Sequence, residues 1–350
     1  MTCNINIMSK KIRVGVIYGG PSVERAISLI TGKAICENLD KKKYDVMPLE
    51  MSKDKKFFLD NNYYKQLNAP GKKSASKKTT LVPVKDNQFG KDKLDIVFLA
   101  LHGTFGEDGK IQSILESLGV KYTGSGVLAS ALGMNKVYSS EIYFANGLPF
   151  PEFINFKKSG WKNDNAKVLE DVKNKIGYPC VLKPVDQGSA LGVSIVESEL
   201  ELKKAIVKTI KQFSWLMVQK FIKGREATCG VLEKNGSPFP LPPTHIVANM
   251  GEFYDYKSKY KKGGSTHVCP ADFEGHINEQ IQTLAVQAHI ALDCTGMSRT
   301  DFMVGDDGKL YVLETNTIPG MTPTSLFPEA AGKMSIDFAR LLDLIIKAAI

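Results

Sequence analysis

The sequence predicts an α/β protein of three lobes, the first of which contains a doubly wound parallel sheet. Through the first 124 residues, apolar β-branched runs alternate with segments of helical periodicity, a pattern that favours parallel strands covered by helices. Glycine-rich turns follow two of these runs, at 19–20 and 103–109, where the ligands of such sheets usually bind. The pattern changes after residue 124. The expected lobes span 1–124, 125–223 and 224–350.

The N-terminal lobe is expected to begin with an apolar strand, a Gly-Gly-Pro turn and a helix capped by Ser22. In that helix, isoleucine and alanine recur at helical spacing from Ile27 to Ile35. Two further apolar runs indicate strands, and a second helix follows the loop at 102–109. The expected strands are 12–17, 44–49 and 94–101, and the second helix spans 111–118.

The central lobe is expected to form a compact α/β unit, with a loop at 184–192 between two of its strands. Its expected helices are 127–132, 136–145 and 199–211, and its strands are 151–156, 178–183, 193–196 and 215–221. In the C-terminal lobe strands predominate. The polar loop at 250–270 is longer than usual for a compact domain and is therefore a candidate lid. A helix at 276–292, a hairpin at 298–314 and an amphipathic helix at 335–346 close the chain.

The charge of the chain is concentrated in one segment. The 350 residues carry a formal net charge of +9, and residues 53–93 hold eleven lysines against four aspartates, which accounts for seven of those charges. We interpret 53–93 as a solvated insertion in the N-terminal lobe that can be shortened without loss of activity. A nucleic-acid or membrane partner is not expected, because such a surface would spread its cations over a structured face with aromatic residues between them.

Composition excludes several other classes of protein. No apolar run reaches the length of a membrane-spanning helix, and the N-terminus lacks the features of a secretion signal. The six cysteines are scattered without a C-x-x-C pair, so neither a disulfide framework nor a zinc site is indicated. We therefore expect a reduced, cytoplasmic setting for this protein.

The hairpin predicts a metal site. If Asp307 and Gly308 form its tip, Asp301 lies opposite Glu314, and Arg299 opposite Asn316. The four side chains then share one face, because side chains alternate along a strand. Two carboxylates and a carboxamide are oxygen ligands suited to Mg²⁺. A solvated face with an ordinary cross-strand ion pair is the alternative for any one of these residues.

A magnesium ion with so few protein ligands usually also binds phosphate. The expected phosphate cradle is 183–192, where a strand delivers Lys183 and two glycines let the backbone approach an anion. Glu24 and His102 follow strands of the first lobe and are expected at the carboxyl end of its sheet. For each of these residues taken alone, a structural role is also possible.

Taken together, these segments form a set that resembles one known family, the D-alanine–D-alanine ligases. The match runs in family order from about residue 12 to the C-terminus. The segments that carry it are Gly-Gly-Pro-Ser-Val-Glu-Arg at 19–25, Leu-His-Gly-x-x-Gly-Glu-Asp-Gly at 101–109, Tyr-Thr-Gly-Ser-Gly at 122–126, Lys-Pro at 183–184 with Gly-Ser at 188–189, Phe-Tyr-Asp-Tyr-Lys-Ser-Lys-Tyr at 253–260, Arg-Thr-Asp at 299–301 and Glu-Thr-Asn-Thr-x-Pro-Gly-Met-Thr at 314–322.

The resemblance implies an ATP-grasp fold and a ligation in two half-reactions. ATP would first phosphorylate the carboxylate of one D-alanine, and the amine of a second D-alanine would then attack the acyl phosphate. Asp301, Glu314 and Asn316 would hold two Mg²⁺ or Mn²⁺ ions, and Arg299 with the backbone N–H of Gly320 would form the oxyanion site. The residues implied in ATP binding are Lys136, Lys183, Gln219, Lys220, Glu226, Phe253 and Lys259.

The resemblance also assigns the substrate residues. Glu24 would bind the ammonium group of the first D-alanine and form a hydrogen-bonded triad with Ser189 and Tyr260, which fasten the lid and orient the second substrate. The residues implied in substrate binding are Glu24, Ile27, His102, Tyr260, Arg299 and Ser325. Tyr260 favours an amine over a hydroxyl nucleophile. The sequence departs from the family pattern at Ile27, Ala190 and Gln219.

Three functions are weighed on these observations. The first is a D-alanine–D-alanine ligase of the cell-wall pathway, which the resemblance implies to be a homodimer through the N-terminal lobe. The second is another ATP-grasp ligase with a different second substrate, such as D-lactate or D-serine. The third is a basic, non-enzymatic binding protein, which the confinement of charge to 53–93 argues against.

Overall fold

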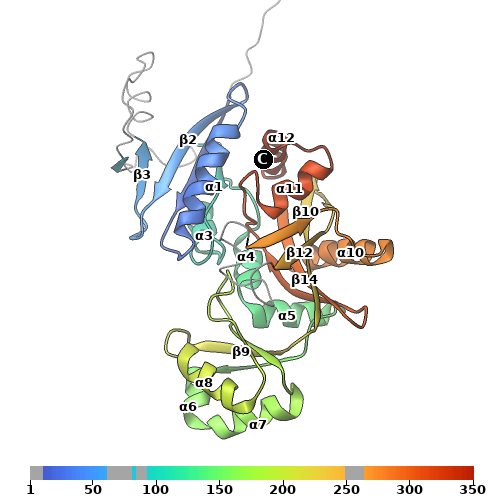
Figure 1. Ribbon diagram of the computed structural model, residues 1–350. Helices are drawn as coiled ribbons and strands as arrows, with labels where there is room; N and C mark the ends of the chain where they lie inside the picture. The colour runs from blue at the N-terminus through green and yellow to red at the C-terminus, as the bar shows by residue number, and fades with distance from the viewer. Residues whose placement is uncertain (1–10, 61–80, 84–92, 249–263) are drawn as a thin grey trace, which may run out of the picture.

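The computed structural model describes residues 11–60, 81–83, 93–248 and 264–350. Three sheets organise them, and Figure 1 shows the central one, with its helices, set apart below the other two. No helix in these ranges is both long and apolar enough to cross a membrane. Each sheet draws its strands from one of the three expected lobes. The boundaries at 124 and 223 stay predictions.

The first sheet has the strand order β4-β3-β2-β1-β5. Its strands are β1 (Ile12–Gly19), β2 (Tyr44–Met51), β3 (Phe57–Asp60), β4 (Leu81–Pro83) and β5 (Ile96–Leu99), and the helices beside it are α1 (Arg25–Asn38) and α3 (Lys110–Ser117). β1 is parallel to both β2 and β5, as the alternation of strands and helices predicts. The carboxyl end of β1 leads through Gly19 and Gly20, both with positive φ, into α1.

The lysine-rich segment contains two short strands, and its interpretation as an insertion stays a prediction. β3 and β4 lie within 53–93 and extend the first sheet by antiparallel pairing with β2 and with each other. The reason is local: the short runs Phe57-Phe58-Leu59 and Leu81-Val82 have strand-forming residues that the many lysines around them hide in a composition count. Most of the lysines lie at 61–80 and 84–92, outside the described residues, so the dispensability of that part stays a prediction.

The central sheet is antiparallel with the order β6-β9-β7-β8. Its elements are β6 (Phe153–Lys157), β7 (Cys180–Pro184), β8 (Ser194–Val196), β9 (Trp215–Lys220), α6 (Lys158–Asn163), α7 (Asn165–Lys175) and α8 (Glu199–Thr209), preceded by α4 (Val127–Met134) and α5 (Lys136–Ala145). The sequence did not predict α6 or α7, although Asp164 caps α7 by accepting a hydrogen bond from the Lys167 N–H.

The third sheet has the order β13-β12-β10-β14-β15, with β11 paired to β10. Its elements are β10 (Gly224–Lys234), β11 (Ser237–Pro240), β12 (Thr244–Ala248), β13 (Ser265–Val268), β14 (Met297–Gly305), β15 (Leu310–Asn316), α10 (Gly275–Ala291), α11 (Leu326–Lys333) and α12 (Phe338–Ala348). The expected loop at 250–270 is thus too long, since β13 lies inside it. The rest of that loop, 250–263, lies outside the described residues.

The hairpin confirms the predicted pairs and corrects the predicted tip. Asp301 pairs with Glu314, and Arg299 with Asn316. The strands are joined by four residues, 306–309, rather than by a two-residue turn, and a register shift between Asp301 and Phe302 compensates for the difference. A β-bulge of this kind is common beside functional sites.

The C-terminal helix joins the first and third lobes through one apolar core. Leu341, Leu342, Ile345 and Ile346 of α12 are fully buried in the same cluster as the strands of the first sheet. At the edge of this contact the buried Asp343 carboxylate accepts a hydrogen bond of 2.7 Å from the Tyr44 hydroxyl of β2. Figure 1 shows α12 beside α1. The same cluster contains Ile17 of β1 and Met297 of β14, so this core joins the first sheet to the third.

Candidate active site

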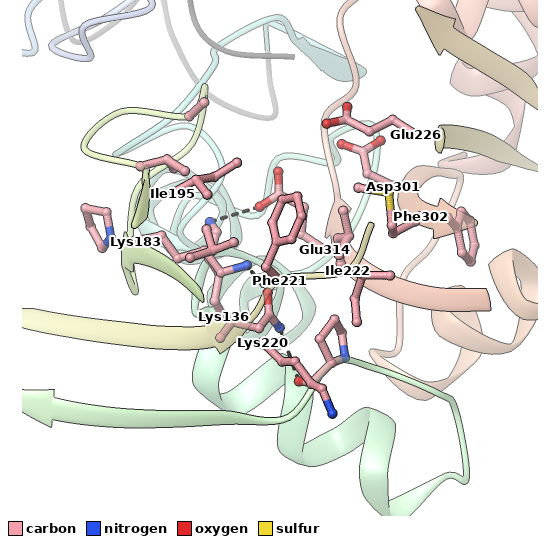
Figure 2. A pocket seen from close by; sticks show the side chains of 18 of the residues that line it. Lys136, Lys183, Ile195, Lys220, Phe221, Ile222, Glu226, Asp301, Phe302 and Glu314 are labelled. Atoms are coloured by element: carbon pink, nitrogen blue, oxygen red, sulfur yellow. Dashed lines mark hydrogen bonds and ion pairs between the residues drawn. The ribbon is translucent and has the colours of Figure 1, made fainter. Parts of the chain in front are cut away.

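Two adjoining pockets lie among the three sheets and share Glu314. The first, here called the lysine cleft, lies between the central and third sheets and is drawn in Figure 2. The second, here called the arginine pocket, lies between the first and third lobes. The polar side chains of the lysine cleft are Lys136, Lys183, Gln187, Gln219, Lys220, Glu226, Asp301 and Glu314. Those of the arginine pocket are Glu24, His102, Glu107, Ser189, His267, Arg299, Glu314, Asn316, Thr322, Thr324 and Ser325.

Two buried lysines point into the lysine cleft. Asn135 caps α5 and so fixes Lys136 at its first position; the Lys136 ammonium lies 3.0 Å from Glu314 and donates to the Gln187 carbonyl at 2.6 Å. Lys183 leaves β7 and donates to Gln219 Oε1 of β9 at 2.7 Å (Figure 2). Burial, and then the charge of Lys136, lowers the pKa of Lys183 to about 8. Two buried cations this close favour an anion between them.

The remaining walls of the cleft suit a flat apolar group with polar edges. Val181, Ile195, Phe221, Ile222 and Phe302 line it. At one end Gln219, which is 4% exposed, has its amide fixed by Lys183 and by the Pro151 carbonyl; Lys220 pairs with Glu152 at 3.4 Å on the surface side. Glu226 of β10 lies near Asp301 at the other end, as Figure 2 shows. The cleft therefore brings together five of the seven residues expected to bind ATP.

The carboxylates of the hairpin are held by cations and amides of the chain itself. Both oxygens of Asp301 accept from the Arg299 guanidinium at 3.0 Å, and Asp301 also accepts from Thr228 at 2.6 Å and Asn316 at 3.3 Å. Among the described residues no three or more His, Cys, Asp and Glu side chains are grouped to hold a metal by themselves. Asp301, Glu314 and Asn316 provide oxygen donors beside a cleft for an anion. That donor set fits Mg²⁺ whose other ligands come from phosphate.

Glu24 and Ser189 meet across the arginine pocket. Glu24 stands just before α1, where Ser22 Oγ accepts from its N–H, and its side chain accepts a hydrogen bond from Ser189 Oγ of the loop after β7. Ser189 and Ala190 have φ of 52° and 53°, in the left-handed region that few non-glycine residues adopt. Backbone strain of this kind is common in loops that form functional sites. The third member of the expected triad, Tyr260, lies outside the described residues, as do Phe253 and Lys259.

Two more titratable groups lie beneath Glu24. Burial lowers the pKa of His102, whose Nε2 lies 3.1 Å from the Thr31 hydroxyl, so the imidazole is neutral at pH 7. Burial, and then the charge of Glu24, raises the pKa of Glu107 to about 8, although Glu107 accepts from the Gly103 N–H at 2.5 Å. Glu107 belongs to the segment 101–109, but no pattern in the sequence indicated a role for it.

The far end of the arginine pocket is the start of α11. Ser325 is its N-cap residue, and its hydroxyl lies 2.7 Å from Thr322 Oγ1 and accepts from the Thr322 N–H at 3.2 Å. A Cβ at Gly320 would come within 3.3 Å of the same hydroxyl, so the turn packs closely there. Ile27 lines the pocket from α1. His267, which no sequence pattern indicated, lines it from β13.

Comparison with known proteins identifies the family. The chain matches the family models for the D-ala D-ala ligase N-terminus at residues 13–125 and C-terminus at residues 142–347. It is 37% identical to the D-alanine–D-alanine ligase of Leptospira interrogans over 97% of this chain and 99% of that one. The chain belongs to the D-alanine–D-alanine ligase family. The ligase is also 38% identical to the protein of that name from Desulforamulus reducens, covering 97% and 99% of the two chains.

Solved structures agree with this assignment. The ligase resembles the VanG D-Ala:D-Ser ligase of Enterococcus faecalis with a TM-score of 0.83 at 29% identity, over 97% of this chain and 100% of the other. It resembles the D-alanine–D-alanine ligase of Bacillus anthracis complexed with ATP with a TM-score of 0.73 at 31% identity, over 96% and 97% of the two chains. The expected ATP-grasp fold and the ATP-dependent ligase activity are confirmed by these matches.

Proposed function

We propose that this ligase joins two molecules of D-alanine into D-alanyl-D-alanine for peptidoglycan synthesis, with cleavage of ATP to ADP and phosphate. The observation that carries the proposal is the junction of the two pockets at Glu314. A cleft with buried lysines opens there onto a pocket that contains an acid, an arginine and a helix N-terminus. Each polar end of a zwitterionic amino acid thus has an oppositely charged group to meet.

ATP occupies the lysine cleft in this proposal. Lys136 and Lys183 hold its phosphates, and the apolar side chains around Gln219 and Lys220 enclose the adenine. Glu226 receives the ribose hydroxyls, and Phe253 and Lys259 are assigned to the same site. A buried lysine whose pKa is lowered, as that of Lys183 is, regains its full charge when a phosphate replaces the lost water.

Asp301, Glu314 and Asn316 are the residues that would hold two Mg²⁺ or Mn²⁺ ions. When bound, the ions would neutralise the phosphate charges and polarise the bond to the transferred phosphoryl group. The proximity of Lys136 to Glu314 and of Arg299 to Asp301 supports the assignment of both carboxylates to positive charge.

The first D-alanine lies in the arginine pocket with its ammonium group on Glu24. Ser189 fixes the Glu24 carboxylate by its hydrogen bond, His102 supports the pocket as a neutral imidazole, and Ile27 closes it on the methyl side. The substrate carboxylate then faces the lysine cleft, where one of its oxygens attacks the γ-phosphorus of ATP. ADP leaves, and an acyl phosphate forms.

The second D-alanine attacks that acyl phosphate with its neutral amine. Negative charge develops on the carbonyl oxygen, where Arg299 and the N–H of Gly320 stabilise it. Ser325 and the N-terminus of α11 receive the carboxylate of the second substrate. Tyr260 is assigned to the lid that orients the amine, and closure of the lid excludes water that would hydrolyse the acyl phosphate. The tetrahedral intermediate then expels phosphate to give the dipeptide.

A second candidate function is ligation of D-alanine to D-serine. The high structural similarity to the VanG D-Ala:D-Ser ligase favours it. The test is to measure ADP release with D-alanine as the sole amino acid, and then with D-serine or D-lactate added. The proposal expects full turnover with D-alanine alone. Rapid turnover only after D-serine is added would establish the second candidate in its place.

We also propose a homodimer that forms through the N-terminal lobe. The support is that Val23, two residues before α1, and Ile30, near the middle of α1, are 66% and 57% exposed, because exposed apolar side chains occur at protein–protein interfaces. Sedimentation equilibrium would test this assignment, since a monomer at micromolar concentration would exclude it. The use of ATP favours the cytoplasm as the location.

A further inference from the structure

His267 faces the ligand side of the third sheet, although the proposed mechanism does not use it. His267 pairs with Ile246 of β12, which pairs with Glu226 of β10, which pairs with Met303 of β14. Residues that pair across strands share a face, and side chains two apart on one strand also share it. His267 therefore lies on the face that carries Arg299, and its side chain lines the arginine pocket.

A carboxylate and a hydroxyl fix the orientation of the His267 ring. Nδ1 lies 3.1 Å from Oε2 of Glu329, and Nε2 lies 3.3 Å from the Ser265 hydroxyl. The two side chains of this contact are 22% and 33% exposed. A carboxylate on Nδ1 selects the tautomer with a proton there. The pair thus ties the edge strand β13 to the first turn of α11.

The position of Glu329 is the reason that this pair matters for binding. Glu329 lies in the first turn of α11, four residues after the N-cap Ser325. Ser325 lines the end of the pocket assigned to the carboxylate of the second substrate. A helix N-terminus attracts a carboxylate. A glutamate in the same turn opposes it, because like charges repel at this range.

We propose that the contact of His267 with Glu329 offsets the charge of Glu329 and thereby sets the affinity of the second-substrate subsite. The proposal rests on the function proposed above, since it needs a second substrate with a carboxylate at the start of α11. A hydrogen bond donated by Nδ1 of His267 stabilises the Glu329 carboxylate and holds it against β13. Glu329 acts as a positioning residue, because it holds the His267 ring beside the pocket.

The test uses three variants and a matched control. The variants are His267→Gln, Glu329→Gln and the double variant. The control is His276→Gln, because His276 and Glu274 form another His–Glu pair, 3.4 Å apart and exposed at the start of α10, that lines neither of the two pockets. Initial rates of phosphate release at saturating ATP give separate KM values for the first and second amino acid. A second series gives the KM for ATP.

If the charge of Glu329 weakens binding of the second substrate, the variants should differ in the KM of the second amino acid alone. His267→Gln raises the KM of the second amino acid about 3-fold to 10-fold, because Glu329 loses its partner. The double variant restores that KM to within about 2-fold of wild type, since no charge is left to offset. In both variants kcat, the first KM and the KM for ATP stay within about 2-fold, and the control leaves all four parameters unchanged.

Two results would overturn the proposal. A double variant as impaired as His267→Gln would show that the ring contributes shape rather than charge. A parallel change in kcat or in the KM for ATP would show a general disturbance of the third sheet. The product of the wild-type enzyme is identified by mass spectrometry first, and the variants are then assayed with whichever second amino acid it uses. Failure of the proposed function is thereby separated from failure of this inference.

Discussion

Replacement of Arg299 by alanine probes the step in which the peptide bond forms. The side chain has two tasks: it donates two hydrogen bonds of 3.0 Å to Asp301, and it is proposed to stabilise the negative charge on the oxygen of the tetrahedral intermediate. Loss of one preorganised donor to an oxyanion lowers kcat about 10²-fold to 10³-fold, or about 3–4 kcal/mol in the activation barrier.

The first of these tasks, the pair with Asp301, makes a separate contribution to stability. Without Arg299 the Asp301 carboxylate keeps only the donors from Thr228 and Asn316 among the contacts described above. Because the arginine and aspartate side chains are 15% and 16% exposed, the loss falls below that of a fully buried pair and is about 1–3 kcal/mol in the free energy of unfolding. Urea denaturation measures it independently of activity.

The assay is ADP release at saturating ATP and D-alanine, with Thr228→Ala as the control. Thr228→Ala also removes a donor from Asp301 but leaves the oxyanion site intact, so its kcat should fall less than about 10-fold. Arg299→Lys retains a cation without the bidentate geometry and should fall between the two. If Arg299→Ala kept kcat within 10-fold of wild type, or if Thr228→Ala lost as much as Arg299→Ala, the oxyanion assignment would be wrong.

Three other substitutions test the pockets and their support. Lys183→Met should raise the KM for ATP about 10-fold to 100-fold, because a charge-assisted contact to phosphate is lost; an unchanged value in initial-rate kinetics would remove Lys183 from the site. Because the pKa of Glu107 is raised to about 8, its buried neutral form stabilises the fold fully below about pH 4.5, and this contribution is lost as the pH rises towards 8. The urea midpoint of the wild type should therefore fall over that pH range, and Glu107→Gln should make the fall smaller. An equal fall in the wild type and the variant would contradict the assignment. Gly32→Ala should destabilise the fold by about 1–3 kcal/mol despite the higher helix propensity of alanine, because the new Cβ would lie 2.2 Å from the Tyr18 ring. A higher thermal midpoint in the variant would refute the close packing of α1 on β1 at this position.

The paired residues of the hairpin could be predicted because local rules determine them. Alternation along two strands places Arg299, Asp301, Glu314 and Asn316 on one face in any even register. The true turn shifts the register near the tip by one residue, and the bulge between Asp301 and Phe302 restores the predicted pairs. The same holds for α5, whose predicted limits at 136–145 match the structure, because Asn135 supplies an N-cap that is visible in the sequence.

The remaining parts of the site depend on contacts between distant segments. His267 has no local signal, since its place beside α11 follows from the pairing of β13 with β12 and from the packing of a helix about 60 residues later. Glu107 could be seen as a motif residue, but its raised pKa results from burial against Glu24, which comes from another element. α6 and α7 were missed because lysine and asparagine interrupt their short apolar patterns.

Transfer of an oxygen atom from substrate to phosphate tests the central claim most directly. The ligase is incubated with ATP, Mg²⁺ and D-alanine labelled with ¹⁸O in both carboxylate oxygens. The ¹⁸O content of the dipeptide and of the inorganic phosphate is then measured by mass spectrometry. Attack of the carboxylate on ATP predicts one ¹⁸O atom in each phosphate released, with one D-alanyl-D-alanine formed for each ADP. Unlabelled phosphate, or phosphate release without dipeptide, would contradict the acyl-phosphate route and the roles assigned to both pockets.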